Sequence, residues 1–243
     1  MGRLVCAAVA DADDLELAAC YGPAAAGETV VAGVELSADP AVVGTAEVVV
    51  EFTRPDVVLG NLAWWHRLGV HAVVGTSGFD AARVEQVREM WGEGPGRCFI
   101  VPNFAVGAVL AMRLAEIAAP FFPAAEVIEM HHDAKADAPS GTALATAQRI
   151  GAAAPDQRRT VDGVPSPPRA LGAEVAGVRV HSVRLPGMLA HQAVLFGKPG
   201  ETLTIRHDTT DRAAFVPTVL LAVRRVATLD DPVTVGLDRL LGL

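Results

Sequence analysis

The segment 129–143, EMHHDAKADAPSGTA, gathers side chains that can bind anions or move protons. It holds two adjacent histidines, His131 and His132, then Lys135 and a Pro-Ser-Gly-Thr turn. Only two of the twenty basic residues of the chain are lysines. A lysine can change its protonation state where an arginine cannot, which general acid catalysis requires. We therefore expect a site for an anionic substrate here, with Lys135 facing the anion or delivering a proton.

The flanking runs predict the elements that hold this segment. AAEVIEM (124–130) is apolar and rich in strand-forming residues, so the histidines leave the carboxyl end of a strand. The run ALATAQRI continues a helix that Ser140 can cap and that Gly141 and Thr142 open. Free backbone N–H groups and the positive end of the helix dipole make such a start a binding site for a carboxylate or phosphate.

Three other interpretations compete for this segment. A metal site is disfavoured, because neighbouring strand residues point to opposite faces and no third histidine or cysteine stands at ligand spacing. A serine nucleophile is disfavoured, because neither PSGT nor GTSG (75–78) matches the GxSxG elbow. A solvated loop with an ordinary helix cap would explain the Pro-Ser-Gly turn, but not the two histidines and the lysine beside it.

The segment HHDAKADAPSGTA resembles the signature of the 4-hydroxy-tetrahydrodipicolinate reductase family. Further segments resemble the same family in the same order, so that the resemblance covers the chain from Val48 onward. They are VEFTRPDVVLGNL (50–62), HAVVGTSGF (71–79), VPNFAVGAVL (101–110), VHSVRLPGMLAHQAVLFGKPGETLTIRHD (180–208) and FVPTVLLAVRRV (215–226).

This resemblance implies hydride transfer from NADPH or NADH to an unsaturated cyclic dicarboxylate on the route to diaminopimelate and lysine. It makes His131 the proton donor and gives Lys135 the acid-assisting and carboxylate-holding role. The substrate-binding residues that it implies are His132, Ser140, Gly141 and Thr142. The sequence leaves open a second role for His132, as a strand-end residue with one structural hydrogen bond.

Up to about residue 120, strand-like and helix-like runs alternate. The strand-like runs are ELAACY (16–21), AEVVVEF (46–52), HAVVGT (71–76) and CFIVPN (98–103). The predicted helices run from Pro55 to Leu68 and from Asp80 to Trp91. This pattern predicts an α/β fold with a Rossmann-like, doubly wound parallel sheet.

Ligands of such sheets bind beyond the carboxyl ends of the strands. On its own GTS (75–77) would be a plain turn. The resemblance assigns cofactor binding to the residues of two such turns, which are Gly75, Thr76, Ser77, Val101, Pro102, Asn103 and Phe104. It leaves the choice between NADH and NADPH open.

The later part of the chain predicts a second, α+β domain for substrate binding and oligomerisation. The runs VAGVRVHSVRL, AHQAVLF and ETLTIRHD alternate as strands of a mixed or antiparallel sheet covered on one side. Residues 152–172 predict a long loop, and residues 211–226 a helix that returns to the first domain. We assign 1–103 and 211–243 to the dinucleotide-binding domain and 104–210 to the second. The free face of the second sheet suits an oligomer, and the resemblance implies a homotetramer.

Composition narrows the partners further. The 243 residues are 51% hydrophobic, which indicates a soluble globular protein with a sizeable core. A net charge of −8 argues against nucleic acid and anionic membranes as partners. There is no membrane-span or signal pattern, and the three cysteines show no disulfide spacing, so a cytoplasmic location is expected.

The chain departs from the family pattern at its start and in two other places. It begins Met1-Gly2-Arg3, as if with the last residues of a GxxGxxG loop, and no acid follows ELAACY before Glu28. We expect a strand and glycine loop to be encoded ahead of Met1, and Gly2–Ala10 to be a helix. Ala193 follows His-Gln where the family commonly has Glu, and Leu171 stands where an arginine is expected. A non-catalytic relative that binds the dinucleotide weakly, as a regulatory or interaction subunit, is the alternative function.

Overall fold

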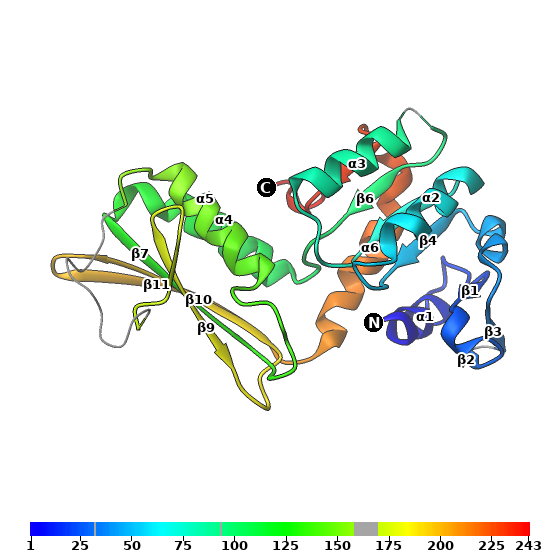
Figure 1. Cartoon of the computed structure of the whole chain (residues 1–243), viewed down its shortest axis with the longest axis horizontal. Helices are drawn as coiled ribbons and strands as arrows, with labels where there is room; N and C mark the ends of the chain where they lie inside the picture. Colours follow the sequence, from blue (N-terminus) through cyan, green and yellow to red (C-terminus); the bar gives the residue numbers. More distant parts are fainter. Residues whose placement is uncertain (32, 93, 158–169) are drawn as a thin grey trace. The chain divides into compact units, whose positions relative to one another are not determined.

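The computed structural model describes residues 1–31, 33–92, 94–157 and 170–243. The chain divides into two compact units (Figure 1). Unit 1 comprises Met1–Phe104 and Arg212–Leu243, and unit 2 comprises Ala105–Asp211. Within the described residues, no helix is both long and apolar enough to cross a membrane.

Unit 1 is built on a parallel four-stranded sheet of order β12-β6-β5-β4. Its strands are β4 (Val48–Glu51), β5 (His71–Val74), β6 (Cys98–Ile100) and β12 (Val233–Val235). The crossover helices are α2 (Val58–Leu68) and α3 (Ala81–Trp91). Both predicted helices and three of the predicted strands are thus confirmed. Asp80 caps α3 by accepting from the Arg83 N–H at 2.8 Å, and Gly69 ends α2 in the left-handed conformation with φ 73°.

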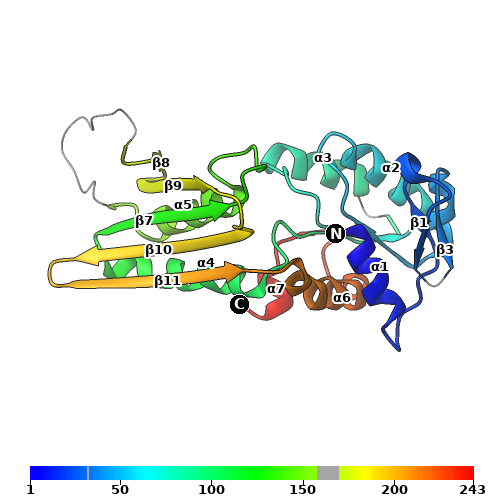
Figure 2. The ribbon, with the colours of Figure 1, turned by 90° about the horizontal axis from the view of Figure 1, so that it is seen from below.

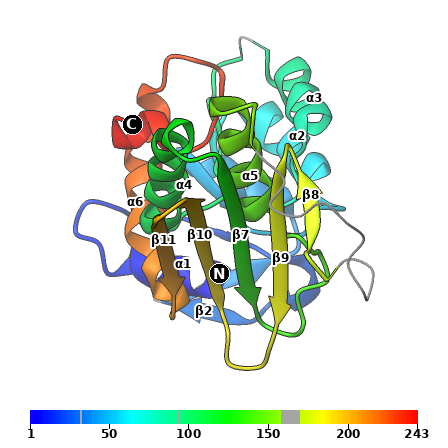
Figure 3. The ribbon, with the colours of Figure 1, turned by 90° about the vertical axis from the view of Figure 1, so that its left-hand side faces the viewer.

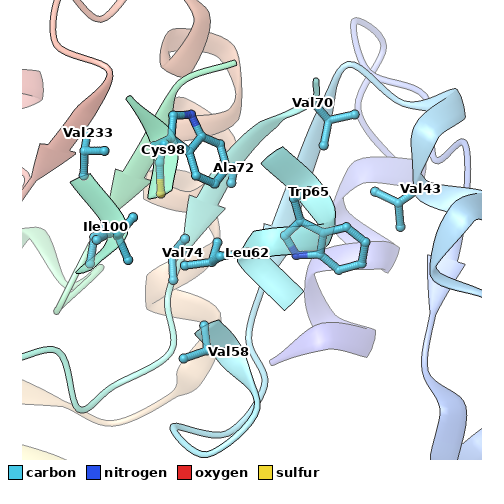
Figure 4. Close-up of a cluster of buried hydrophobic side chains, with 12 residues drawn as sticks. Val43, Val58, Leu62, Trp65, Val70, Ala72, Val74, Cys98, Ile100 and Val233 are labelled. Atoms are coloured by element: carbon cyan, nitrogen blue, oxygen red, sulfur yellow. The ribbon is translucent and has the colours of Figure 1, made fainter. Parts of the chain in front are cut away.

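The core of unit 1 lies between this sheet and its helices (Figure 4). Leu62 and Trp65 of α2 are fully or almost fully buried against Ala72 and Val74 of β5. The strands are short and nearly continuous in apolarity because both of their faces are covered. Because the four strands run parallel, their carboxyl ends lie at the same edge of the sheet.

The N-terminal part of unit 1 forms a separate small sheet. The helix α1 (Gly2–Ala10), predicted from the sequence, is confirmed. The sheet has the order β1-β3-β2, with β1 (Cys20–Tyr21), β2 (Thr29–Val31) and β3 (Val34–Ser37), and two short 3-10 segments, η1 (Pro23–Ala25) and η2 (Pro40–Thr45), accompany it.

The predicted strand 16–21 was wrong in its extent, since only Cys20–Tyr21 pairs with a neighbour, β3. Residues 15–19 and the free edge of β4 line one cavity of about 510 Å³. A strand forms only where a neighbouring strand pairs with its backbone N–H and C=O groups. Among the described residues, neither 15–19 nor the free edge of β4 has such a neighbour. The expected strand ahead of Met1 stays a prediction.

The C-terminal residues complete unit 1. They form η4 (Arg212–Phe215), α6 (Val216–Arg225), η5 (Val226–Thr228) and α7 (Asp238–Leu241). The helix predicted at 211–226 is therefore confirmed, with a 3-10 first turn. Val219 and Ala222 of α6 are fully buried, and α6 packs against α1 and β5.

Unit 2 is a mixed five-stranded sheet of order β11-β10-β7-β9-β8 (Figures 2 and 3). Its strands are β7 (Ala124–His131), β8 (Ala173–Val175), β9 (Val178–Arg184), β10 (Ala190–Lys198) and β11 (Glu201–Thr209). Among the described strands of this sheet, β7 and β9 form the one parallel pair. The helices α4 (Val106–Ala118) and α5 (Gly141–Ala153) cover one face, with η3 (Ala119–Phe121) after α4. A mixed sheet covered on one side is the predicted architecture.

The opposite face of this sheet carries no covering element among the described residues. Ile128 of β7, Ala193 of β10 and Leu195 of β10 belong to it, by their alternation with the buried Val127 and Val194. Ala193, one of the departures from the family pattern, therefore lies on this face and not on the helix-covered one. Most of the predicted loop 152–172 falls on residues 158–169, which are outside the described residues.

Candidate functional site

The carboxyl end of β7 brings a buried acid next to a histidine. Glu129 and His131 are two residues apart on the strand, so both project from its helix-covered face, as Val127 does. Glu129 is fully buried, and the neighbouring strands set Gln192 and Ser182 at its sides. A buried carboxylate needs hydrogen-bonding or charged partners to remain ionised.

Those partners are Arg184 and His131. Arg184, the last residue of β9, binds the carboxylate with two nitrogens, Nη1 to Oε2 at 3.0 Å and Nη2 to Oε1 at 2.9 Å. The Nδ1 atom of His131 is hydrogen-bonded to Oε2. Burial alone would raise the pKa of Glu129, but the hydrogen bonds from His131 and Arg184 outweigh it and lower that pKa to about 2. The carboxylate is therefore ionised throughout the neutral range.

Arg184 also holds the loop that carries Lys135. Its Nε donates to the Lys135 carbonyl at 3.2 Å, and its Nη2 donates to the Asp137 carbonyl. The Lys135 ammonium binds both carboxylate oxygens of Asp137, at 2.7 and 2.8 Å. Burial acts to raise the pKa of Asp137, yet the bond from Lys135 lowers it overall. In this structure Asp137 thus binds the Lys135 ammonium group, which a substrate carboxylate would require.

The start of α5 lies after this loop and is capped as predicted. The hydroxyl of Ser140 accepts from the Ala143 N–H at 3.2 Å. A Cβ added at Gly141 would meet no protein atom within 4 Å, so the first turn of the helix faces open space. An open approach to the first turn is what an anion site at a helix start needs.

One neutral pair adjoins the site from α5 and β10. The amide of Gln192 donates to the hydroxyl of Thr146 at 2.8 Å, and that hydroxyl in turn donates to the Thr142 carbonyl at 2.8 Å. The Oε1 atom of Gln192 is buried and has no hydrogen-bond partner in the described part of the chain.

His132 lies just beyond β7, and its carbonyl accepts from the Lys135 N–H at 3.1 Å. Its role in substrate binding stays a prediction.

In unit 1 the predicted cofactor residues occupy two adjacent turns at the carboxyl edge of the parallel sheet. The Gly75 N–H donates to the Glu51 carbonyl at 2.9 Å, and the Val101 N–H donates to the Val74 carbonyl at 2.8 Å. These bonds align the turn 75–77 with the turn 101–104, as the topology of a doubly wound sheet requires.

Packing explains why a glycine stands at position 75. A Cβ there would come within 2.1 Å of the Phe52 ring. That ring packs on Phe104, which is itself buried, at a centroid distance of 5.5 Å. The buried Thr76 donates from its hydroxyl to the Thr53 carbonyl at 3.3 Å. Ser77 and Pro102 are exposed and Asn103 is half-buried. Ser77 and Asn103 therefore present polar groups at this edge of the sheet.

The structure thus groups the predicted residues into two sets, one in each unit. His131, Lys135 and the start of α5 belong to unit 2, where Arg184 links the acid beside His131 to the Lys135 loop, and the two turns belong to unit 1. Sequence reasoning missed Glu129, Arg184 and Asp137. The signal for Glu129 was an acid in an otherwise apolar strand at the same-face distance from His131. The pairing of Arg184 with it depends on strand register and had no local signal.

Comparison with known proteins places these features in a family context. A model described as "Dihydrodipicolinate reductase, N-terminus" matches residues 1–104, and one described as "Dihydrodipicolinate reductase, C-terminus" matches residues 107–241. The 4-hydroxy-tetrahydrodipicolinate reductase of Nocardia farcinica is 53% identical over 100% of this chain and 95% of the relative. That of Cutibacterium acnes is 47% identical, with the same coverage.

A solved structure gives the same comparison in three dimensions. The dipicolinate-bound dihydrodipicolinate reductase from Paenisporosarcina sp. TG-14 superposes with a TM-score of 0.77 at 32% identity. The match covers 98% of this chain and 94% of that one.

Proposed function

The chain belongs to the dihydrodipicolinate reductase family, and we propose that its reaction proceeds through His131 and Lys135 at the carboxyl end of β7. It is an NAD(P)H-dependent 4-hydroxy-tetrahydrodipicolinate reductase of diaminopimelate and lysine biosynthesis. The observation that carries the site assignment is the buried Glu129 bonded to His131, beside the lysine loop and the open start of α5.

The cofactor is NADH or NADPH, and the residues of unit 1 fit its nicotinamide end. Gly75 leaves room that a side chain would fill, and the turns 75–77 and 101–104 stand at the sheet edge where dinucleotides bind. When bound, the reduced nicotinamide supplies the hydride. The sequence-based assignment is retained for Gly75, Thr76, Ser77, Val101, Pro102, Asn103 and Phe104.

The substrate is a small cyclic dicarboxylate, and unit 2 offers two groups that suit its carboxylates. One is the start of α5, where the space beside Gly141 is open to a ligand. The other is the ammonium of Lys135, which a substrate carboxylate takes over from Asp137. The dipicolinate in the related solved structure supports a dicarboxylate of this size. His132 and Ser140 complete the substrate-binding set.

His131 supplies the proton that accompanies the hydride. Its Nδ1 is bound to Glu129, which leaves Nε2 to carry the transferable proton. The proton passes from Nε2 to the substrate atom next to the one that accepts the hydride. Lys135 assists by holding the adjacent carboxylate, which fixes the reacting atoms relative to His131.

A cofactor-oxidation assay tests this assignment. Freshly condensed pyruvate and aspartate semialdehyde serve as the substrate, and NADH and NADPH are each supplied in turn. His131→Ala and Lys135→Ala should each lower kcat by roughly 10²–10⁴-fold, the range of a positioned acid, while cofactor affinity stays within about twofold. Losses below tenfold for both folded variants would refute the roles given to these side chains.

The two units are proposed to divide the work. Unit 1 binds the dinucleotide, and unit 2 binds the substrate and carries the subunit interface. The uncovered face of the mixed sheet, with Ile128 and the 39% exposed Leu195, supports a homotetramer formed through that face. A cytoplasmic location is proposed as well, since Cys6, Cys20 and Cys98 are all free thiols.

A further inference from the structure

The pairing of Glu129 with His131 has the geometry of a device that orients a catalytic ring. An ionised carboxylate only accepts hydrogen bonds, so its bond to Nδ1 requires that this nitrogen carry a proton. In the neutral ring the proton is then on Nδ1 and Nε2 is the free base. In the protonated ring the Nε2–H is the one left to give away.

We propose that Glu129 is a positioning residue for the reductase reaction, which fixes the tautomer and ring orientation of His131 and, through Arg184, the loop of Lys135. This inference rests on the proposed function of the same site. Glu129 itself does not touch the substrate and stays ionised through the cycle.

The guanidinium of Arg184 connects the Glu129 carboxylate to the loop of Lys135. Two of its nitrogens hold both oxygens of Glu129, and the same group binds the carbonyls of Lys135 and Asp137. A planar fork that is fixed at one end has little freedom at the other. One buried acid is therefore bonded to the His131 ring at the end of β7 and, through Arg184, to the backbone of the loop that carries Lys135.

A purely structural role makes a different prediction. If Glu129 served only to neutralise Arg184, a substitution that kept the fold would leave the tautomer of His131 unchanged. If it orients His131, its loss removes the charged acceptor that keeps the proton on Nδ1, and the ring no longer prefers that tautomer.

The kinetic test compares Glu129→Gln with Glu126→Gln. Glu126 is on the same strand but the opposite face, where it binds His181 at 2.8 Å. We expect Glu129→Gln to lower kcat by roughly 10–10²-fold, the range for loss of a carboxylate that accepts from the second ring nitrogen of a functional histidine. The KM for the cofactor should change less than threefold. Glu129→Asp should recover part of the lost kcat, because it restores a carboxylate acceptor, and Glu126→Gln should leave kcat unchanged.

A spectroscopic test does not depend on activity. Long-range ¹⁵N–¹H correlation spectra of the wild-type protein should show neutral His131 as the Nδ1–H tautomer, against the Nε2–H form that free histidine prefers. Glu129→Gln should lose that preference, and Glu126→Gln should keep it. An Nε2–H tautomer in the wild type, or an unchanged kcat in a folded Glu129→Gln, would overturn the proposal. A protein with the expected tautomer but no reductase activity would refute the proposed function and leave the orienting contact standing.

Discussion

Glu129→Gln should change how the stability of unit 2 depends on pH. The pKa of this buried carboxyl is about 2 in the folded protein, against an ordinary value of 4.5, because His131 and Arg184 hydrogen-bond to its charged form. A carboxyl with a lowered pKa stabilises the fold at pH values above 4.5, and the contribution is lost as the pH falls toward 2. At about 1.4 kcal/mol for each pH unit, the full contribution is about 3 kcal/mol.

The variant should therefore differ from the wild type by a pH-dependent amount. Near pH 7 we expect it to unfold with a free energy about 3–5 kcal/mol lower, because Arg184 keeps its charge and loses its buried partner. Between about pH 5 and pH 3 the wild type gives up about 2 kcal/mol of the contribution of Glu129, which the variant never had. The difference between the two proteins should shrink by that amount.

Urea unfolding at about pH 7, 5 and 3 measures this difference, with far-UV circular dichroism as the readout. Tryptophan fluorescence in the same samples follows unit 1 alone, because Trp64, Trp65 and Trp91 all lie there. Glu126→Gln is the matched control and should stay within about 1 kcal/mol of the wild type at every pH, as partly exposed ion pairs do. A gap between wild type and Glu129→Gln that stays constant from pH 7 to pH 3 would refute the reasoning.

Three further outcomes are expected. Gly141→Ala should leave the melting temperature unchanged, because its methyl group meets no protein atom, yet weaken competition by pyridine-2,6-dicarboxylate roughly tenfold or more; equal competition would move the anion away from the start of α5. Gly75→Ala should lower the stability of unit 1 by about 1–3 kcal/mol and weaken NADPH binding, since its Cβ would strike the Phe52 ring, whereas Gly60→Ala, which meets no neighbouring atom in α2, should do neither; a fluorescence unfolding curve and a cofactor titration decide it. If the uncovered sheet face forms the proposed tetramer, Leu195→Glu should shift sedimentation toward smaller species, and an unchanged sedimentation would place any interface elsewhere.

The sequence by itself determined the local elements and proposed the residues of the site. Continuous apolar runs predicted β4, β5 and β6, the alternating runs predicted β9, β10 and β11, and Ser140 predicted the start of α5. These predictions are confirmed because periodicity and capping act within a few residues of chain. The run 16–21 failed for the opposite reason, since a strand requires a neighbour, and most of this run faces a cavity.

Only the tertiary structure decided which residues of the site contact one another. The contact between Glu129 and Arg184 joins residues 55 apart and exists because β7 and β9 pair in parallel with a register that ends at His131 and Arg184. The engagement of Lys135 by Asp137 and the open space before Gly141 are likewise set by how the loop folds back on that register. Local sequence carries residue types and periods, whereas the partner of a buried charge is chosen by strand order and register, which depend on the packing of the whole unit.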